Sequence, residues 1–210
     1  MKRTLLAAAL AALLLAPAVA QANSQFVIDF EKTWDFSNGD VNGYYGGGTA
    51  ADGSSGSNLG ASFVGVSGLS NDASFTYYSG APSPQGVAYA HTFAAGDVAT
   101  LNVADGVSGA LAFYFASPAA VSGAVKAYSG LDGSGALLGS FDLPANSSSA
   151  YDNWSGAWFA FAGLAHSFDL TASANLVAFD NITAVPEPAP AALVLGGVAM
   201  LALITRRRRG

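Results

Sequence analysis

The central part of this 210-residue chain predicts an all-β fold, an antiparallel β-sandwich or jelly roll, between two terminal segments of a different kind. Short runs rich in aromatic and β-branched residues recur along it, and Gly, Ser, Asn and Asp separate them. No segment of this body shows a sustained helical period. Its roughly 160 residues are enough to bury a core between two sheets. The expected strands are 25–30, 61–66, 73–78, 87–93, 98–103, 110–116, 121–128, 136–142, 157–162, 164–170 and 175–183.

Alternation of side chains within these runs predicts which residues face the core. Leu111, Phe113 and Phe115 would share one face of their strand, and Tyr114 would lie on the other. Trp158 and Phe159 open the strand expected at 157–162 and are both predicted to belong to the core.

The N-terminal segment, 1–22, has the three parts of a secretory signal peptide. Two basic residues open the chain, an apolar run follows at 5–15, and small residues lead up to Ala20 and Ala22. The apolar run is shorter than the about 20 residues that a membrane span needs, so an uncleaved anchor is the weaker alternative. We expect export by the Sec machinery, cleavage by signal peptidase after Ala20 or Ala22, and a body comprising 23–184.

The C-terminal segment, 185–210, also has three parts. Two prolines around Glu187 break any strand or helix because they fix φ and remove backbone donors. The uncharged stretch 189–205 would be about 25 Å long as a helix, near the lower limit for a transmembrane helix. The arginine cluster resists translocation and would hold the C-terminus in the cytoplasm. The motif and cluster residues are Val185, Pro186, Glu187, Pro188, Arg206, Arg207, Arg208 and Arg209.

This order of proline motif, apolar helix and arginine cluster resembles the PEP-CTERM sorting signal of Gram-negative bacteria that make exopolysaccharide. The resemblance implies that an exosortase recognises the tail and that the inner membrane holds the protein only transiently. It also implies a final location at the cell surface or in the extracellular matrix of a biofilm. The alternative is a generic single-span protein with a proline-rich stalk.

The charge of the body excludes several classes of function. Between residues 23 and 185 only Lys32 and Lys126 are basic, against thirteen acidic residues, so the formal charge is −11. Such a body repels phosphate backbones, which argues against nucleic-acid binding. The chain has no cysteine, so disulfides, thiolate catalysis and cysteine metal sites are excluded.

Catalytic chemistry has little support in the sequence. His91 and His166 are the only histidines, and each lies in an alternating run where an ordinary strand residue is expected. A zinc site needs three or four nitrogen or sulfur ligands, which two histidines cannot supply. The chain also has no Gly-x-Ser-x-Gly nucleophile motif. We therefore expect a non-catalytic body. A secreted glycan-active hydrolase with a carboxylate pair is the alternative, because thirteen acidic residues are available.

Three segments of the body resemble the ectodomains often found ahead of PEP-CTERM tails, which are similar to galactose-binding-like and carbohydrate-binding jelly rolls. These segments are 27–31, 41–48 and 178–183. The resemblance implies a structural calcium ion shared by the first and last strands, with Glu31 and Asp180 as ligands and Asp29 as a third. The alternative is that these carboxylates are solvated turn and strand-end residues.

Two loops have the composition of a glycan site, with aromatic rings among short polar residues. The apolar C–H face of a sugar stacks on an aromatic ring, and its hydroxyls bind Asn, Asp and backbone groups. We therefore predict exopolysaccharide binding by these loops. The alternative is that the same rings pack beneath their loops. The candidates are Asn42, Tyr44 and Tyr45 in the first loop, 38–57, and Tyr151, Asp152, Asn153 and Trp154 in the second, 144–154.

Overall fold

The computed structural model describes residues 25–70, 78 and 80–185, which belong to one compact unit, Asn23–Glu187. The predicted signal peptide, transmembrane helix and arginine cluster lie outside the described residues, as do Pro186, Glu187 and Pro188 of the sorting motif. The same holds for nearly all of the strand predicted at 73–78. Within the part of the chain that is described, no helix is both long enough and apolar enough to span a membrane.

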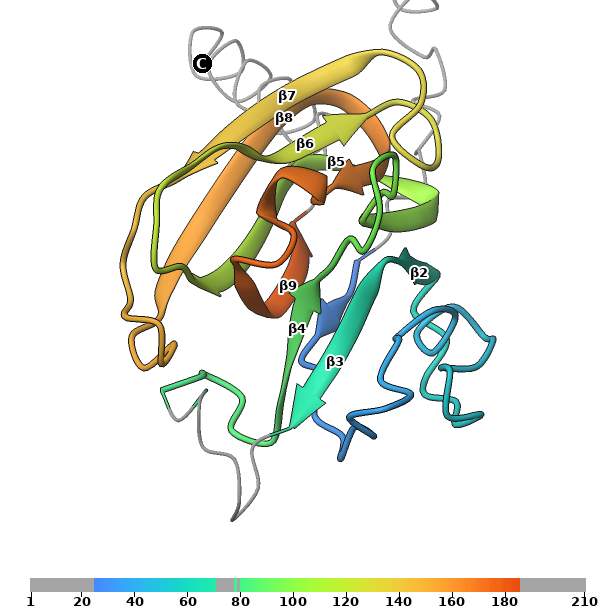
Figure 1. Ribbon diagram of the computed structural model, residues 1–210. Coiled ribbons are helices and arrows are strands. Elements are labelled where there is room, and N and C mark those ends of the chain that lie inside the picture. The colour runs from blue at the N-terminus through green and yellow to red at the C-terminus, as the bar shows by residue number, and fades with distance from the viewer. Residues whose placement is uncertain (1–24, 71–77, 79, 186–210) are drawn as a thin grey trace, which may run out of the picture. The chain divides into compact units, whose positions relative to one another are not determined.

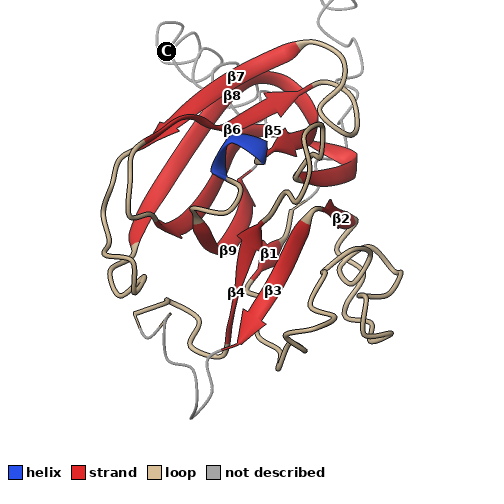
Figure 2. Ribbon diagram, viewed as in Figure 1, coloured by secondary structure: helices blue, strands red, loops and turns tan. Residues whose placement is uncertain are grey.

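The prediction of an all-β body is confirmed. Nine strands form one large antiparallel sheet, and the only helix among the described residues is the short 3-10 helix η2, Thr171–Ser173 (Figure 2). The strands are β1 (Val27–Ile28), β2 (Ala61–Val64), β3 (Val66–Ser70), β4 (Gly86–Ala90), β5 (Thr100–Ala116), β6 (Val121–Tyr128), β7 (Leu137–Leu143), β8 (Ser155–Asp169) and β9 (Ala178–Val185).

The last strand occupies a central place in the sheet. The strand order is β3-β4-β9-β5-β8-β6-β7, with β1 paired to β9 and β2 paired to β5 (Figure 1). Strand β9 therefore separates β4 from β5, and its second half also receives β1, with Val27 opposite Thr183. The first and last strands of the body are thus neighbours.

Two pairs of predicted strands are continuous in the structure. The runs expected at 98–103 and 110–116 form the single strand β5, and those expected at 157–162 and 164–170 form β8. The prediction of separate strands was wrong because glycine was taken as a strand end. Gly106 and Gly163 have φ values of 75° and 86°, which only glycine adopts readily, so the strands bend there while pairing continues on both sides.

The opposite error occurred at Gly65, where one predicted strand, 61–66, divides into β2 and β3. Gly65 has φ of 61°, and a Cβ atom there would lie only 2.4 Å from the carbonyl oxygen of Val98. The chain turns at this close approach, so β2 pairs with β5 whereas β3 pairs with β4.

Aromatic side chains connect distant strands through one core. Leu111, Phe113 and Phe115 are all buried, which confirms the predicted inner face of β5. The Phe113 ring lies 6.2 Å from that of Phe141 in β7 and 5.7 Å from that of Phe179 in β9. Since β7 is three strands away from β5 in the sheet order, the sheet must curve back over this core.

The prediction that Trp158 and Phe159 are both core residues is wrong for Trp158. The Phe159 side chain is 2% exposed, whereas that of Trp158 is 58% exposed. Successive residues of a strand point to opposite faces of the sheet, so only one of the two can reach the core.

Candidate functional site

An open groove of about 520 Å³ lies across four neighbouring strands, on the face of the sheet opposite the core. We call it the aromatic groove. It is lined by Val27 of β1, Ala112, Phe113 and Tyr114 of β5, Gly156, Ala157 and Trp158 of β8, and Asn181 and Thr183 of β9.

The pairing register explains why this face is hollow. Val27 lies opposite Thr183, Thr183 opposite Ala112, and Ala112 opposite Trp158, so these residues form one row across the sheet. Val27 and Trp158 are large and exposed, whereas the two side chains between them are small. Directly opposite residues share a face of the sheet. The small pair therefore forms a floor between two taller walls.

Tyr114 provides a second exposed ring beside this row, with 42% of its surface accessible. Its partner on β8 is Gly156, which has no side chain to occupy the space between the strands. A methyl group at Gly156 would contact the Tyr114 ring, 3.6 Å from its Cε1 atom. The Tyr114 ring therefore lies beside Gly156, where no side chain fills the space, and both residues line the groove.

Asn181 enters the groove from a bulge in β9. Thr183 pairs with Ala112 and Asp180 pairs with Tyr114, so two residues of β9 face only one residue of β5 between these pairs. Asn181 has φ of 48°, in the left-handed region that Asn tolerates better than most residues. Bulges of this kind re-aim side chains at sheet positions where alternation alone would not place them.

A buried hydrogen-bond cluster holds this bulge in place. Asp180 is fully buried, and its Oδ2 and Oδ1 atoms accept the backbone N–H groups of Ser83 (2.8 Å) and Asn181 (2.7 Å). The hydroxyl of Ser83 also donates to Oδ1 of Asn181 at 2.9 Å. The Thr183 hydroxyl donates to the carbonyl of Asn181 at 3.2 Å. Asn181 is therefore fixed through both its backbone and its side chain.

Burial raises the pKa of Asp180 to about 7, and the negative charges of Glu31 and Asp29 add to the rise. The N–H donors of Ser83 and Asn181 oppose this rise because they stabilise the carboxylate. The three carboxylates predicted to bind calcium are thus close enough to interact electrostatically.

Their hydrogen bonds nevertheless go to backbone groups. Glu31 Oε1 accepts the N–H groups of Gln85 (2.8 Å) and Gly86 (3.1 Å), and Asp29 Oδ1 accepts that of Glu31 (3.3 Å). Within residues 25–70, 78 and 80–185, no three acidic or histidine side chains are grouped to hold a metal ion. The calcium site stays a prediction from the resemblance.

The aromatic residues predicted as ligand-binding in the first loop pack beneath that loop. Tyr45 is 6% exposed, and its ring meets those of Phe30 (5.8 Å) and Phe63 (6.4 Å) edge to face. Tyr44 is half-buried against Trp34, with ring centroids 5.3 Å apart. Asn42 is exposed. The ring faces that would stack on a sugar are thus used within the protein.

The second predicted loop cluster is also largely packed. The Tyr151 hydroxyl donates to the carbonyl of Leu176 at 3.0 Å, and Nε1 of Trp154 donates to the carbonyl of Tyr151 at 3.0 Å. Both rings are partly buried, whereas Asp152 and Asn153 are exposed. The two rings cover a small apolar cluster formed by Tyr78, Val87 and Ala178.

His91 belongs to a structural hydrogen-bond group. Asp40 Oδ1 lies 2.9 Å from Nε2 of His91 and 2.6 Å from the hydroxyl of Ser67, so the carboxylate separates the serine from the imidazole. A nucleophilic serine needs the histidine itself as its base, and this order does not provide one. His166 is on β8 and contacts the carbonyl of Ala104 through Nδ1 at 3.1 Å.

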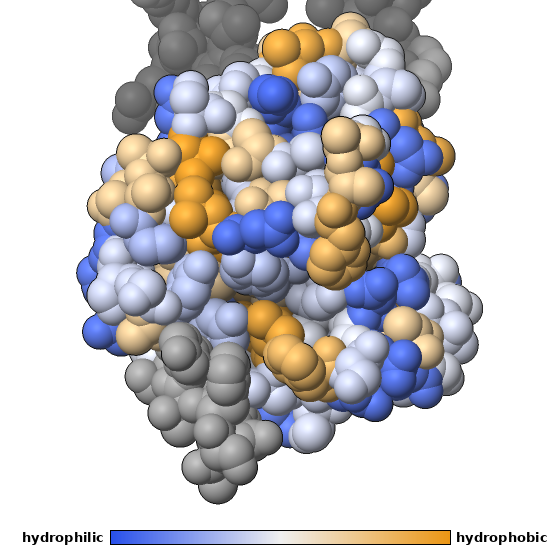
Figure 3. Space-filling view, in the orientation of Figure 1, coloured by the Kyte–Doolittle hydropathy of each residue, from blue (hydrophilic) through white to orange (hydrophobic). Residues whose placement is uncertain are grey.

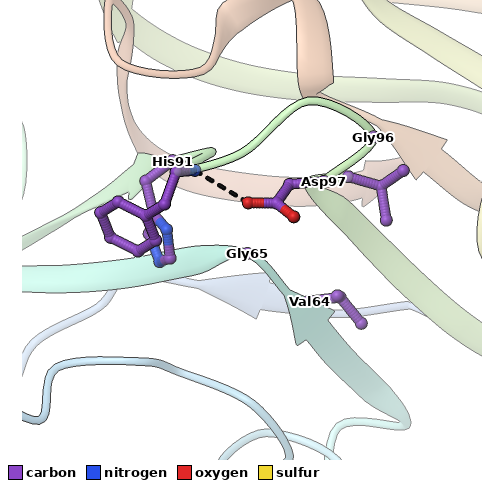
Figure 4. A pocket seen from close by; sticks show the side chains of 7 residues that line it. Val64, Gly65, His91, Gly96 and Asp97 are labelled. Atoms are coloured by element: carbon purple, nitrogen blue, oxygen red, sulfur yellow. Dashed lines mark hydrogen bonds between the residues drawn. The ribbon is translucent and has the colours of Figure 1, made fainter.

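A second pocket of about 390 Å³ lies next to His91 (Figure 4). Asp97 closes its loop by accepting the N–H groups of Ala94 (2.8 Å) and Phe93 (2.9 Å), which lower the pKa of the Asp97 carboxyl. Phe93 lies on the His91 ring, with centroids 4.6 Å apart, and is 87% exposed. This pocket has a single exposed aromatic ring.

On the face of the molecule drawn in Figure 3, apolar groups are separated by hydrophilic ones.

Sequence reasoning missed the aromatic groove, although a signal for it is present. Tyr114 has Ala112 and Ala116 two residues away on either side, and Trp158 has Gly156 and Ala160. An aromatic residue between two small residues at strand spacing indicates a ring that stands above its own face of the sheet. The predicted loops lack that spacing.

Comparisons with known proteins add little to this picture. No protein-family model matches the chain, and no curated protein matches it. Among solved structures, the fold is similar to that of an isomalto-dextranase of Arthrobacter globiformis T6 determined in complex with panose. The TM-score is 0.38, with 13% identity over 59% of this chain and 23% of that chain. A likeness this distant transfers no property of that enzyme.

Proposed function

We propose that this chain is an exported, exosortase-sorted surface or matrix protein whose body binds exopolysaccharide without transforming it. The observation that supports binding most directly is the pair of exposed rings, Tyr114 and Trp158, that rise from the aromatic groove. Stacked sugars need such rings next to hydrogen-bonding groups. Asn181 and Thr183 supply those groups within the same groove.

For the body we propose a jelly-roll-like β-sandwich. Two features support it: the sheet curves until β7 meets the core side of β5, and the first and last strands pair. A sandwich keeps one face of each strand on the core and exposes the other. The aromatic groove would then be an outer face of one layer.

The residues that line the groove favour binding over hydrolysis. A glycosidase needs two carboxyl groups on either side of the bond that it cleaves, and none of the lining residues is acidic. The hydrolase alternative is tested by incubating the protein with polysaccharide and measuring new reducing ends. Their appearance at a rate proportional to protein concentration would overturn the non-catalytic proposal.

The export part of the proposal rests on the terminal sequences. We expect the Sec machinery and signal peptidase to process the N-terminus, and exosortase to remove the tail after transient anchoring in the inner membrane. Intact-mass measurement of protein from its native host should therefore find chains that end near Pro186 to Pro188. Recovery of Arg206 to Arg209 in most molecules would contradict this. Replacing the four arginines with Ser should impair membrane retention and processing.

Binding is tested by affinity electrophoresis in gels that contain the host's exopolysaccharide. The full chain should migrate more slowly in these gels than in plain gels, and Trp158→Ala should lose most of that retardation. A stacked ring contributes about 1–3 kcal/mol by analogy with base stacking, which corresponds to roughly tenfold in affinity or more. Phe93→Ala is the matched control, because Phe93 is an exposed aromatic residue outside the groove. Equal mobility of all forms with and without polysaccharide would overturn the binding proposal.

A further inference from the structure

The charges around the aromatic groove restrict what it can hold. Its lining residues carry no charge. Two acidic residues adjoin lining residues in the chain: Asp29 follows two residues after Val27, and buried Asp180 precedes Asn181. Their carboxylates interact electrostatically. With a formal body charge of −11, an acidic polymer would be repelled. An uncharged ligand meets no such cost.

The two exposed rings, Trp158 and Tyr114, offer the groove two separate stacking surfaces. Trp158 is opposite Ala112, and Tyr114 is opposite Gly156, so the rings are diagonal neighbours on adjacent strands. Diagonal positions in an antiparallel pair are about 7–8 Å apart. Rings on adjacent strands at these positions can each stack on a sugar residue of the same glycan chain.

Asn181 offers the groove a donor whose orientation is fixed. Its Oδ1 atom is occupied by the hydroxyl of Ser83 at 2.9 Å. Asn181 is partly buried, and its hydrogen bonds to other described residues involve Oδ1 and the backbone, none of them Nδ2. The N–H bonds of Nδ2 are thus available to a ligand oxygen, and little orientational freedom has to be lost when one binds.

From these three observations we infer that the aromatic groove takes an uncharged glycan segment of at least two sugar residues, which Asn181 selects by donating its side-chain N–H to a sugar oxygen. This inference rests on the proposed function and adds the ligand class and the selecting residue. Trp158 and Tyr114 would stack on many kinds of sugar without selecting among them. Asn181 would select sugars that place an oxygen acceptor where its side-chain N–H can reach it.

The experiment compares three polysaccharides by affinity electrophoresis of the full chain at low and high salt. The probes are a neutral glucan or galactomannan, the acidic polymer alginate, and the cationic amino-sugar polymer chitosan, alongside the host's exopolysaccharide. We expect a neutral polymer to retard the chain, and we expect high salt to leave that retardation unchanged. Soluble di- or trisaccharides of that polymer should compete, and its monosaccharide should compete at least tenfold less well.

Two variants test Asn181 itself. Asn181→Gly keeps the positive φ without strain and removes the donor, so retention should fall about three- to tenfold, the range for one hydrogen bond. Asn181→Asp replaces the donor with an acceptor in the same shape and should weaken retention at least as much. Thermal melting of each variant shows whether the fold is intact, and Phe93→Ala again serves as the control.

The outcomes separate this inference from the proposed function. Suppose that the host exopolysaccharide retards the chain, but that high salt abolishes the retardation or that alginate retards the chain while neutral polymers do not. The proposed function then stands, and the inference of an uncharged ligand is overturned. Unchanged retention of a folded Asn181→Gly variant would overturn the role of Asn181. Absence of retention on every polymer would overturn both.

Discussion

The aromatic residues of the loops and those of the outer sheet face have opposite environments. Tyr45, deep beneath a glycine-rich loop, is almost fully buried, whereas Trp158, in the middle of a strand, is largely exposed. A long Gly-rich loop has few apolar side chains of its own, so its rings are needed to attach it to the core. A strand is already held by its pairing, which leaves every second side chain free to face solvent. Location in a loop is therefore a poor guide to an accessible ring.

The largest expected effect lies on the buried side of this comparison. Tyr45→Ala should lower the free energy of unfolding by about 3–5 kcal/mol, the range for truncation of a buried aromatic residue. The lost contacts are with Phe30, Phe63 and Tyr44. Denaturant unfolding measures the change, with Trp158→Ala as the exposed counterpart, which should stay within about 0.5 kcal/mol of the wild type. Comparable losses for both variants would abolish the distinction between the two environments.

The next largest effect concerns the buried carboxyl of Asp180, next to Asn181 in the chain. The pKa of Asp180 is raised to about 7 in the folded protein, so between about pH 4 and pH 7 the folded state binds more protons than the unfolded state. The free energy of unfolding should therefore fall by a few kcal/mol as pH rises through this window, and level off above it. Asp180→Asn should remove most of that fall. Unfolding curves across this pH range measure it, and an unchanged slope in the variant would assign the dependence to other groups.

A pair of tryptophan variants tests directly which region binds. Trp154→Ala should cost about 1–2 kcal/mol of stability, less than a fully buried ring, because Trp154 only partly covers its cluster. It should leave polysaccharide retention unchanged. Trp158→Ala should show the reverse, with retention lost and stability kept. If Trp154→Ala weakens retention while the protein stays folded, the loop prediction holds and the aromatic groove is not the site.

The smallest expected effect comes from Gly156. Its φ is not positive, and an added methyl group would touch Tyr114 at ordinary contact distance. Gly156→Ala should therefore stabilise β8 by about 0.5–1 kcal/mol, since glycine is costly inside a strand. The methyl group would also fill part of the groove, so retention should decrease slightly. Thermal melting and affinity electrophoresis on the same preparation measure both effects. A loss of stability would contradict the prediction that the groove wall at Gly156 has room for a methyl group.

The fold class followed from the sequence because alternation is a local property. Leu111, Phe113 and Phe115 identify an inner face by spacing alone, and that prediction is confirmed. Strand ends were less predictable, because Gly106 and Gly163 bend continuous strands whereas Gly65 divides one. The difference depends on which neighbour approaches the glycine, and that neighbour is distant in sequence.

The spacing of small residues around Tyr114 and Trp158 could have indicated two exposed rings, but the floor of the groove and the place of Asn181 could not be predicted, for a similar reason. The small floor residues Ala112 and Thr183 are far apart in the chain and become neighbours only through the β5–β9 register. The position of Asn181 depends on a bulge, and that bulge depends on Ser83 in yet another segment. The calcium site at Asp29, Glu31 and Asp180 was expected from a resemblance alone. The structure places Asp29 and Glu31 within electrostatic reach of Asp180, and calcium binding stays a prediction.

The central place of β9 has a consequence for the order in which the chain can fold. Strands β1, β4 and β5 all pair with β9, which is the last strand of the body to be synthesised and which ends at Val185, where the predicted sorting tail begins. Until β9 arrives, the sheet has unpaired edges on both sides of an empty central position. Pairings between residues so distant in sequence raise the contact order and slow folding. An exported chain would thus complete its sheet only when its final segment has crossed the membrane, which ties the end of folding to the moment when the tail becomes available for sorting.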